Sequence, residues 1–97
     1  SENVFTAKLK YQSSSYENGD TLATFDKSPS SADITVHLNG EDITAKSNIT
    51  VTITNPNGNV VTTVDNNVIG TFTIKYNVKY ETHSEELIRT ITISEKS

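Results

Sequence analysis

The chain of 97 residues contains no cysteine and no methionine. Without cysteine it can form neither a disulfide framework nor a thiolate metal site, and it has no cysteine nucleophile. The stability of the fold must therefore come from packing and hydrogen bonds.

Long hydrophobic runs and an excess of positive charge are also absent. The apolar runs are short pairs such as Val60-Val61 and Val68-Ile69, so the sequence predicts neither a transmembrane segment nor the core of a signal peptide. The net charge of −4 argues against a protein that binds nucleic acid by neutralising phosphates, and against a basic membrane-surface module. We therefore expect no nucleic-acid partner and no direct membrane insertion.

The composition favours strands over helices. Val, Ile, Thr, Tyr and Phe together account for 39 of the 97 residues, whereas Ala and Leu contribute four each. This length fits one domain, which we expect to span residues 1–97 with linker ends at 1–3 and 95–97.

Apolar and polar residues alternate with the period of two that is typical of half-buried strands, and turn-forming residues separate the runs. Asn39-Gly40 suits a tight turn, and Pro56 to Gly58 suits a reversal between two strands. The pattern predicts an antiparallel two-sheet β-sandwich with Greek-key topology. The seven expected strands are residues 5–11, 21–25, 34–38, 49–53, 60–64, 72–80 and 87–94.

The segments between these strands are predicted as turns and loops. Residues 13–20 are rich in Ser, Asn and Gly and indicate a loop, and residues 81–86 are expected to turn the chain. Ser30 with Asp33 could begin a single helical turn. In the last strand, Arg89 falls in register with the buried face and Ile88 points the other way.

From Gly40 onward the chain resembles the bacterial immunoglobulin-like domains that occur in tandem along Gram-positive cell-surface proteins. The resemblance covers about half of the chain. It is carried by Gly40-Glu41-Asp42-Ile43-Thr44, the alternation of residues 49–53, Val64-Asp65, Gly70-Thr71-Phe72-Thr73-Ile74-Lys75-Tyr76-Asn77-Val78 and Arg89-Thr90-Ile91-Thr92-Ile93.

The resemblance implies an immunoglobulin-like sandwich that acts outside the cell as a spacer, stalk or adhesive module. Its partners would be neighbouring domains of the same chain and a host protein or glycan, and the isolated domain would be monomeric. One departure is Phe72, which stands where the family most often has tyrosine.

Clustered side-chain oxygens raise the question of calcium, which prefers six to eight oxygen ligands. The candidates are Glu41, Asp42 and Asp65, together with a third acidic group of Glu81, Glu85 and Glu86. The alternative is that these residues form ordinary turns, since Asp and Asn bond to their own backbone there and no Asp-x-Asp-x-Asp spacing occurs. On this basis we expect no resident metal and no cofactor.

Catalytic motifs are missing from the sequence. The two histidines, His37 and His83, lack the further ligands that zinc needs, and none of the serines lies in a Gly-x-Ser-x-Gly elbow. Lys8 and Lys10 could be considered for an isopeptide crosslink, but both alternate onto the polar face and the last strand has no asparagine. We therefore expect no catalytic residues and no enzymatic activity.

The resulting hypothesis is a non-catalytic structural or adhesion module of a bacterial protein at the cell surface, in the cell wall or secreted. Two alternatives remain open at this point. One is a decoration domain of a phage or another extracellular assembly, and the other is a carbohydrate-binding β-sandwich module.

Overall fold

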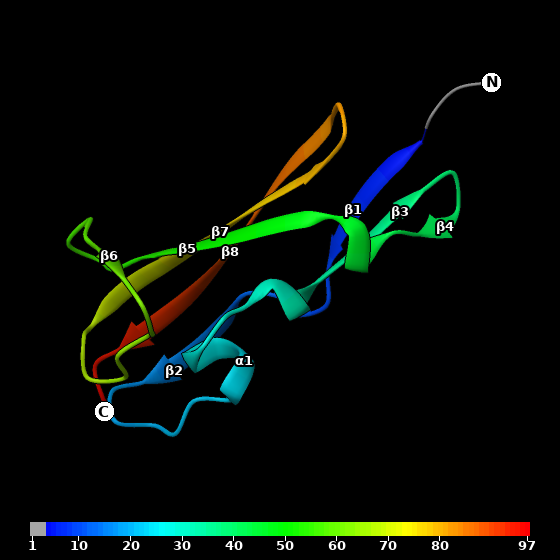
Figure 1. Ribbon diagram of the computed structural model, residues 1–97. Coiled ribbons are helices and arrows are strands. Elements are labelled where there is room, and N and C mark those ends of the chain that lie inside the picture. Colours follow the sequence, from blue (N-terminus) through cyan, green and yellow to red (C-terminus); the bar gives the residue numbers. More distant parts are fainter. Residues whose placement is uncertain (1–3) are drawn as a thin grey trace.

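The computed structural model describes residues 4–97, so the linker expected at residues 1–3 lies outside the described part. Two packed sheets form an all-β sandwich, as predicted, with strand orders β1-β3-β4 and β2-β8-β7-β5-β6 (Figure 1). The described strands number eight rather than seven. They are β1 (Phe5–Leu9), β2 (Ser14–Glu17), β3 (Ile34–Leu38), β4 (Glu41–Asp42), β5 (Asn48–Thr54), β6 (Val60–Val61), β7 (Gly70–Tyr80) and β8 (His83–Ser94); the helical segments are α1 (Thr24–Lys27), η1 (Ser31–Asp33) and η2 (Thr44–Lys46).

The larger sheet is built on the long antiparallel pair β7 and β8, which stay in register from Gly70↔Ile93 to Tyr80↔His83. Along β7, alternate side chains are buried, as expected for a strand with one face on the core. Ile88 of β8 points outward and is half exposed, as predicted. The buried apolar core consists of Ile34, Val36, Ile43, Ile53, Val64, Phe72, Ile74, Tyr76, Val78, Ile91 and Ile93.

The loop predicted at residues 13–20 is wrong in its first half, because this segment contains β2. This strand pairs parallel with β8, from Ser14↔Ile91 to Glu17↔Ser94, so the sandwich is not purely antiparallel. Three consecutive serines hid the strand, since serine carries little apolar signal. Tyr16 is the one large apolar side chain of β2, and it lies on the more buried face of the strand.

The strand predicted at residues 21–25 is also wrong, because the chain forms the single turn α1 there instead. The helical turn considered at Ser30 is confirmed as η1. The Ser30 hydroxyl accepts a hydrogen bond from the amide of Ala32, and the carboxylate of Asp33 accepts one from the amide of Ser30 at 3.0 Å.

The reversal predicted at residues 81–86 is shorter than expected. Glu81 has a positive φ of 53° in a tight turn, and β8 begins already at His83. Residues 84–86 are exposed on both faces of the strand, so the alternation that reveals a strand is absent from them. Conversely, the strand expected at 60–64 is reduced to Val60–Val61, and Val64 is buried in the loop that follows.

The two sheets do not cover each other along their full length. Figure 1 shows the three-stranded sheet over one end of the larger sheet, while the chain that carries α1 lies over the other end. A single helical turn and its flanking loops thus take the place of strands in the second layer. Such a segment has few ladder hydrogen bonds to hold it and must be held by side chains.

The free edge of β3 is closed by a side chain rather than by a long strand. The Thr44 hydroxyl accepts a hydrogen bond from the amide of Val36 at 2.8 Å and donates one to the carbonyl of Val36 at 3.4 Å. The amide of Ile43 donates a further bond to that carbonyl. The backbone amide and carbonyl of Val36, a fully buried core residue, thereby have hydrogen-bond partners although the neighbouring strand β4 is only two residues long.

Replacing Thr44 by valine keeps the shape of the side chain but leaves the Val36 amide without its acceptor. We expect the free energy of unfolding to fall by about 1–3 kcal/mol, the usual cost of an unsatisfied buried donor. Thr50→Val, at an exposed position of β5, is the matched control and should change it by less than about 0.5 kcal/mol. Equal effects in urea denaturation would show that the Thr44 bonds contribute nothing.

Candidate functional site

An ion pair lies inside the sandwich beneath α1. Arg89 of β8 and Asp26 of α1 are each 1% exposed, and the Arg89 Nη1 lies 2.6 Å from the Asp26 Oδ1. The Arg89 Nη2 also donates to the backbone carbonyl of Phe25. Arg89 reaches this position because it has the same phase as Ile91 and Ile93, so the strand directs it inward, as predicted.

Two further side chains complete the arginine's hydrogen bonding. The Arg89 Nε donates to the hydroxyl of Tyr76 at 3.0 Å, and that hydroxyl donates to the Asp33 Oδ2 at 2.6 Å. The Arg89 Nη2 lies 3.5 Å from the same carboxylate oxygen. All three nitrogens of the guanidinium therefore have partners, which is the condition for burying a charge.

Tyr16 connects strand β2 to this group. Its hydroxyl donates to the Asp26 Oδ2 at 2.5 Å and accepts a hydrogen bond from the amide of Ala23 at 3.2 Å. We call Tyr16, Asp26, Asp33, Tyr76 and Arg89 the polar cluster. Within residues 4–97, the one buried side-chain polar atom without a partner is the Oδ1 of Asn18, which lies outside it.

The polar cluster contains one positive and two negative charges, and the two phenols supply the remaining donors. Burial alone would lower the pKa of Arg89, but its bonds to Tyr76 and Asp26 raise that pKa above its usual value. Burial raises the pKa of Tyr76 and of Tyr16, and the bonds from these hydroxyls to carboxylates raise both further. The cluster thus favours a charged arginine and neutral tyrosines.

Stability should decline as the pH rises above about 10, the ordinary pKa of tyrosine. Because the pKa of Tyr76 is raised in the folded state, the unfolded chain loses this proton at lower pH than the folded chain does. The contribution of Tyr76 to the free energy of unfolding is therefore fully present below about pH 10 and is lost as the pH rises further. Urea denaturation between pH 8 and 11 would measure the slope. Tyr76→Phe should flatten it and Tyr16→Phe should flatten it less; an unchanged slope in Tyr76→Phe would contradict the assignment.

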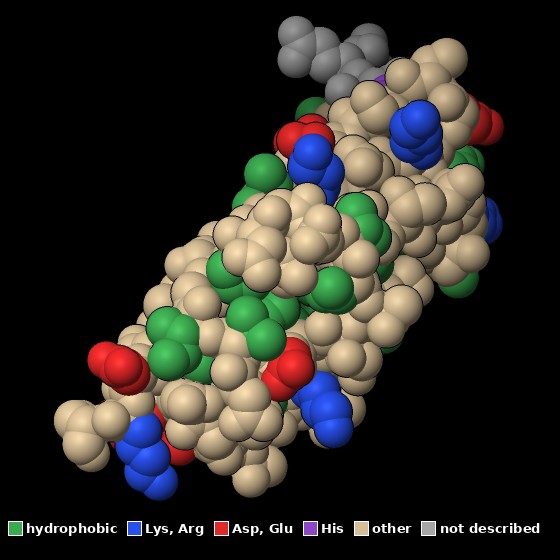
Figure 2. All heavy atoms as spheres, turned by 90° about the vertical axis from the view of Figure 1, so that its left-hand side faces the viewer, with side chains coloured by type: hydrophobic (Ala, Val, Ile, Leu, Met, Phe, Trp, Pro, Cys, Tyr) green, Lys and Arg blue, Asp and Glu red, His purple; other side chains and the backbone are tan. Residues whose placement is uncertain are grey.

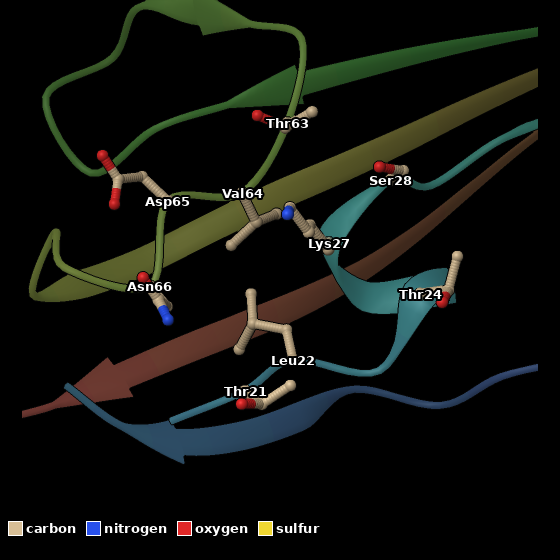
Figure 3. Close-up of a pocket in the computed structure, with 9 residues that line it drawn as sticks. All are labelled: Thr21, Leu22, Thr24, Lys27, Ser28, Thr63, Val64, Asp65 and Asn66. Atoms are coloured by element: carbon tan, nitrogen blue, oxygen red, sulfur yellow. The ribbon is translucent and has the colours of Figure 1, made fainter. Parts of the chain in front are cut away.

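A groove opens beside the polar cluster, between the chain around α1 and the loop after β6 (Figure 3). Its volume is about 810 Å³, and a backbone bond from the Val64 amide to the Lys27 carbonyl closes it on one side. Leu22 and Val64 face each other at its centre (Figure 3). The lining residues are Thr21, Leu22, Thr24, Lys27, Ser28, Thr63, Val64, Asp65 and Asn66.

The side chains that line this groove are mainly polar and uncharged. The groove presents hydroxyl, amide and single charged side chains, but neither histidine lines it. The carboxylates of the polar cluster, Asp26 and Asp33, do not line it; they are 1% and 3% exposed and are engaged with the arginine and the tyrosines. A neutral, hydroxyl-bearing ligand fits these donors and acceptors.

The candidate calcium ligands do not come together. Glu41 and Asp42 form β4, whereas Asp65 lines the groove from the loop between β6 and β7. That loop and β4 lie at opposite ends of the molecule (Figure 1). Hydrogen bonding from the side chain of Thr44, and then from its amide, holds the pKa of the Asp42 carboxylate below the usual range. The Asp65 carboxylate accepts a hydrogen bond from the amide of Asn67. No group of three His, Cys, Asp or Glu side chains placed for a metal occurs among residues 4–97.

The other candidates lie apart from the groove. Glu81 is in the β7–β8 turn, and Glu86 is 3.8 Å from Lys75 on the sheet surface, with Glu85 directed to the other face of β8. His83 falls in the turn predicted at residues 81–86, but it begins β8 instead, and its ring stacks on that of Phe5 with the centroids 5.0 Å apart.

His37 lies in β3 opposite Thr6 and is partly buried. Lys8 and Lys10 are exposed, as expected. No helix in the described part is long and apolar enough to cross a membrane.

Sequence reasoning missed the partners of Arg89. The available signal was an arginine in phase with two buried isoleucines, which requires carboxylates nearby. No protein-family model matches the chain, and no curated protein matches it either.

Proposed function

We propose that this chain is a non-catalytic structural module of a bacterial surface or secreted protein, in which it spaces neighbouring domains. The observation that carries the proposal is its shape: the domain measures 55 × 21 × 18 Å, and β1 begins towards one end of the long axis whereas β8 ends towards the other (Figure 1). Successive domains joined at these ends would extend in a line.

Other features agree with this proposal. The charged groups of the polar cluster, Asp26, Asp33 and Arg89, are at most 3% exposed, so a substrate has no access to them. On the face seen in Figure 2, acidic and basic side chains are interspersed, without a large patch of one sign that would attract a charged polymer. The resemblance of residues 40–93 to bacterial immunoglobulin-like domains points to the same role.

A domain exchange tests the spacer function. In the protein that carries this module, replacing it by an unrelated β-domain of similar length should leave the activities of the flanking domains unchanged. Shortening the protein by deleting the module should reduce their reach. If the exchange abolishes attachment to a surface, the module is adhesive instead.

The groove beside α1 favours one second candidate, a carbohydrate-binding module. Its hydroxyl-lined walls around Leu22 and Val64 match a neutral sugar. A glycan array probed with the isolated domain would test this. Binding that is lost in Thr63→Ala but kept in Thr50→Ala, at an exposed position outside the groove, would support it, and an array without signal would contradict it.

A further inference from the structure

We propose that the domain resists tension applied through its two ends, and that Tyr16, Asp26 and Arg89 lock the pair of strands that carries this load. The biological use of this property rests on the proposed spacer function. The property itself follows from how β2 and the last strand, β8, are joined.

The direction of β2 relative to β8 decides how a pulling force acts. The two strands are parallel and in register over four residue pairs, and the start of β1 and the end of β8 lie towards opposite ends of the long axis (Figure 1). A force on the ends draws β2 back toward the N-terminal end and β8 forward toward the C-terminal end. The strands are then sheared along their length, so all of their hydrogen bonds must yield together rather than one after another.

The strand before β2 is loaded in the same way. β1 runs along β3 through five residue pairs, from Phe5↔Leu38 to Leu9↔Ile34. A pull from its N-terminal end draws it along the axis of β3, which again strains several bonds at once. The N-terminal segment is thus held twice, first by β1 and then by β2.

Side chains reinforce the second of these contacts. Tyr16 extends from β2 to the Asp26 Oδ2, and Arg89 extends from β8 to the Asp26 Oδ1, so one carboxylate bridges the two strands. Both bonds are short and charge-assisted, and the Arg89–Asp26 pair is fully buried. The amide of Thr90 also donates to the Ser13 hydroxyl at 2.9 Å, next to the start of β2.

Single-molecule force spectroscopy on a chain of identical copies tests the geometry. Pulling through the two ends should require a clearly higher force than pulling between Thr21→Cys and the C-terminus. In the second arrangement both attachment points lie beyond the same ends of β2 and β8, so the strands peel apart bond by bond. The absence of native cysteine makes this attachment specific.

Two tyrosine substitutions test the side-chain lock. Tyr16→Phe removes the bridge to β2 and should make unfolding at a given end-to-end force about tenfold faster or more, the factor expected for one charge-assisted bond broken at the barrier. Tyr76→Phe is the matched control, since it removes a hydroxyl from the same cluster without touching β2. It should lower equilibrium stability at least as much but change the unfolding rate under force less.

Two results would overturn the inference: equal forces in the two pulling directions, or a larger effect under force from Tyr76→Phe than from Tyr16→Phe. Either result would leave the spacer proposal intact, because the domain exchange measures length and not strength. Failure of the exchange would likewise leave the force measurement valid.

Discussion

Arg89→Met is expected to lower the free energy of unfolding by about 3–5 kcal/mol, the usual cost of removing one partner from a buried ion pair. The substitution preserves much of the side chain's volume but leaves Asp26 and Asp33 without their counter-charge. It also removes the donors to Tyr76 and to the carbonyl of Phe25. Equilibrium unfolding in urea at neutral pH measures the loss.

Two comparisons separate the buried charge from the loss of an arginine as such. Lys75→Met removes a cation from an ion pair on the outer face of β7, where both side chains are about half exposed, and should change stability by less than about 1 kcal/mol. Combining Arg89→Met with Asp26→Asn and Asp33→Asn removes the stranded charges and should restore part of the loss. An Arg89→Met loss no larger than that of Lys75→Met would mean that the polar cluster is not formed.

Phe72→Ala is expected to cost about 3–5 kcal/mol, because it leaves a cavity in the centre of the core. Phe72 is 1% exposed and lies opposite Ile91 in the β7–β8 ladder. Neighbouring strands hold the surrounding backbone in place, so the site can collapse only slightly. Thermal and urea unfolding should both report the loss.

Ile88→Ala provides the control on the same pair of strands. Ile88 points away from the core and is 50% exposed, so its truncation should cost less than about 1 kcal/mol. A small effect at Phe72 together with a large one at Ile88 would mean that the faces of the sheet are assigned the wrong way round.

The core strands were predictable because their side chains report the environment directly. Phe72, Ile74 and Tyr76 alternate with polar residues, and the opposing strands show the same period. A strand that buries one face can hardly be read another way, since a slip of one residue would turn every apolar side chain outward. For this reason β3, β5 and β7 agree with prediction to within a few residues.

The elements that failed are those in which tertiary contacts override local pattern. β2 is a strand because β8 offers it a free edge, and α1 is a helical turn because Asp26 must face Arg89. Neither reason can be seen in the few residues concerned. Similarly, β8 extends to His83 because β7 continues alongside it, although its exposed residues alone resemble a turn.

The polar cluster was half predictable. The alternation along β8 places Arg89 on the buried face and thus predicts a buried guanidinium. Its acidic partners, however, lie 56 and 63 positions earlier in the chain, on segments without a periodic pattern. Only the fold brings them together. The groove beside α1 was not predictable at all, because it is formed by two loops that are distant in sequence.

The pairing of β2 with β8 also governs how the protein can be made. During synthesis β2 leaves the ribosome long before residues 91–94, with which it pairs. Until β8 has been synthesised, Tyr16 and Asp26 can bond to each other, but Asp26 lacks its ion-pair partner Arg89. The nascent domain therefore cannot fold progressively from its N-terminal strands, because β2 has no partner until residues 91–94 have been translated.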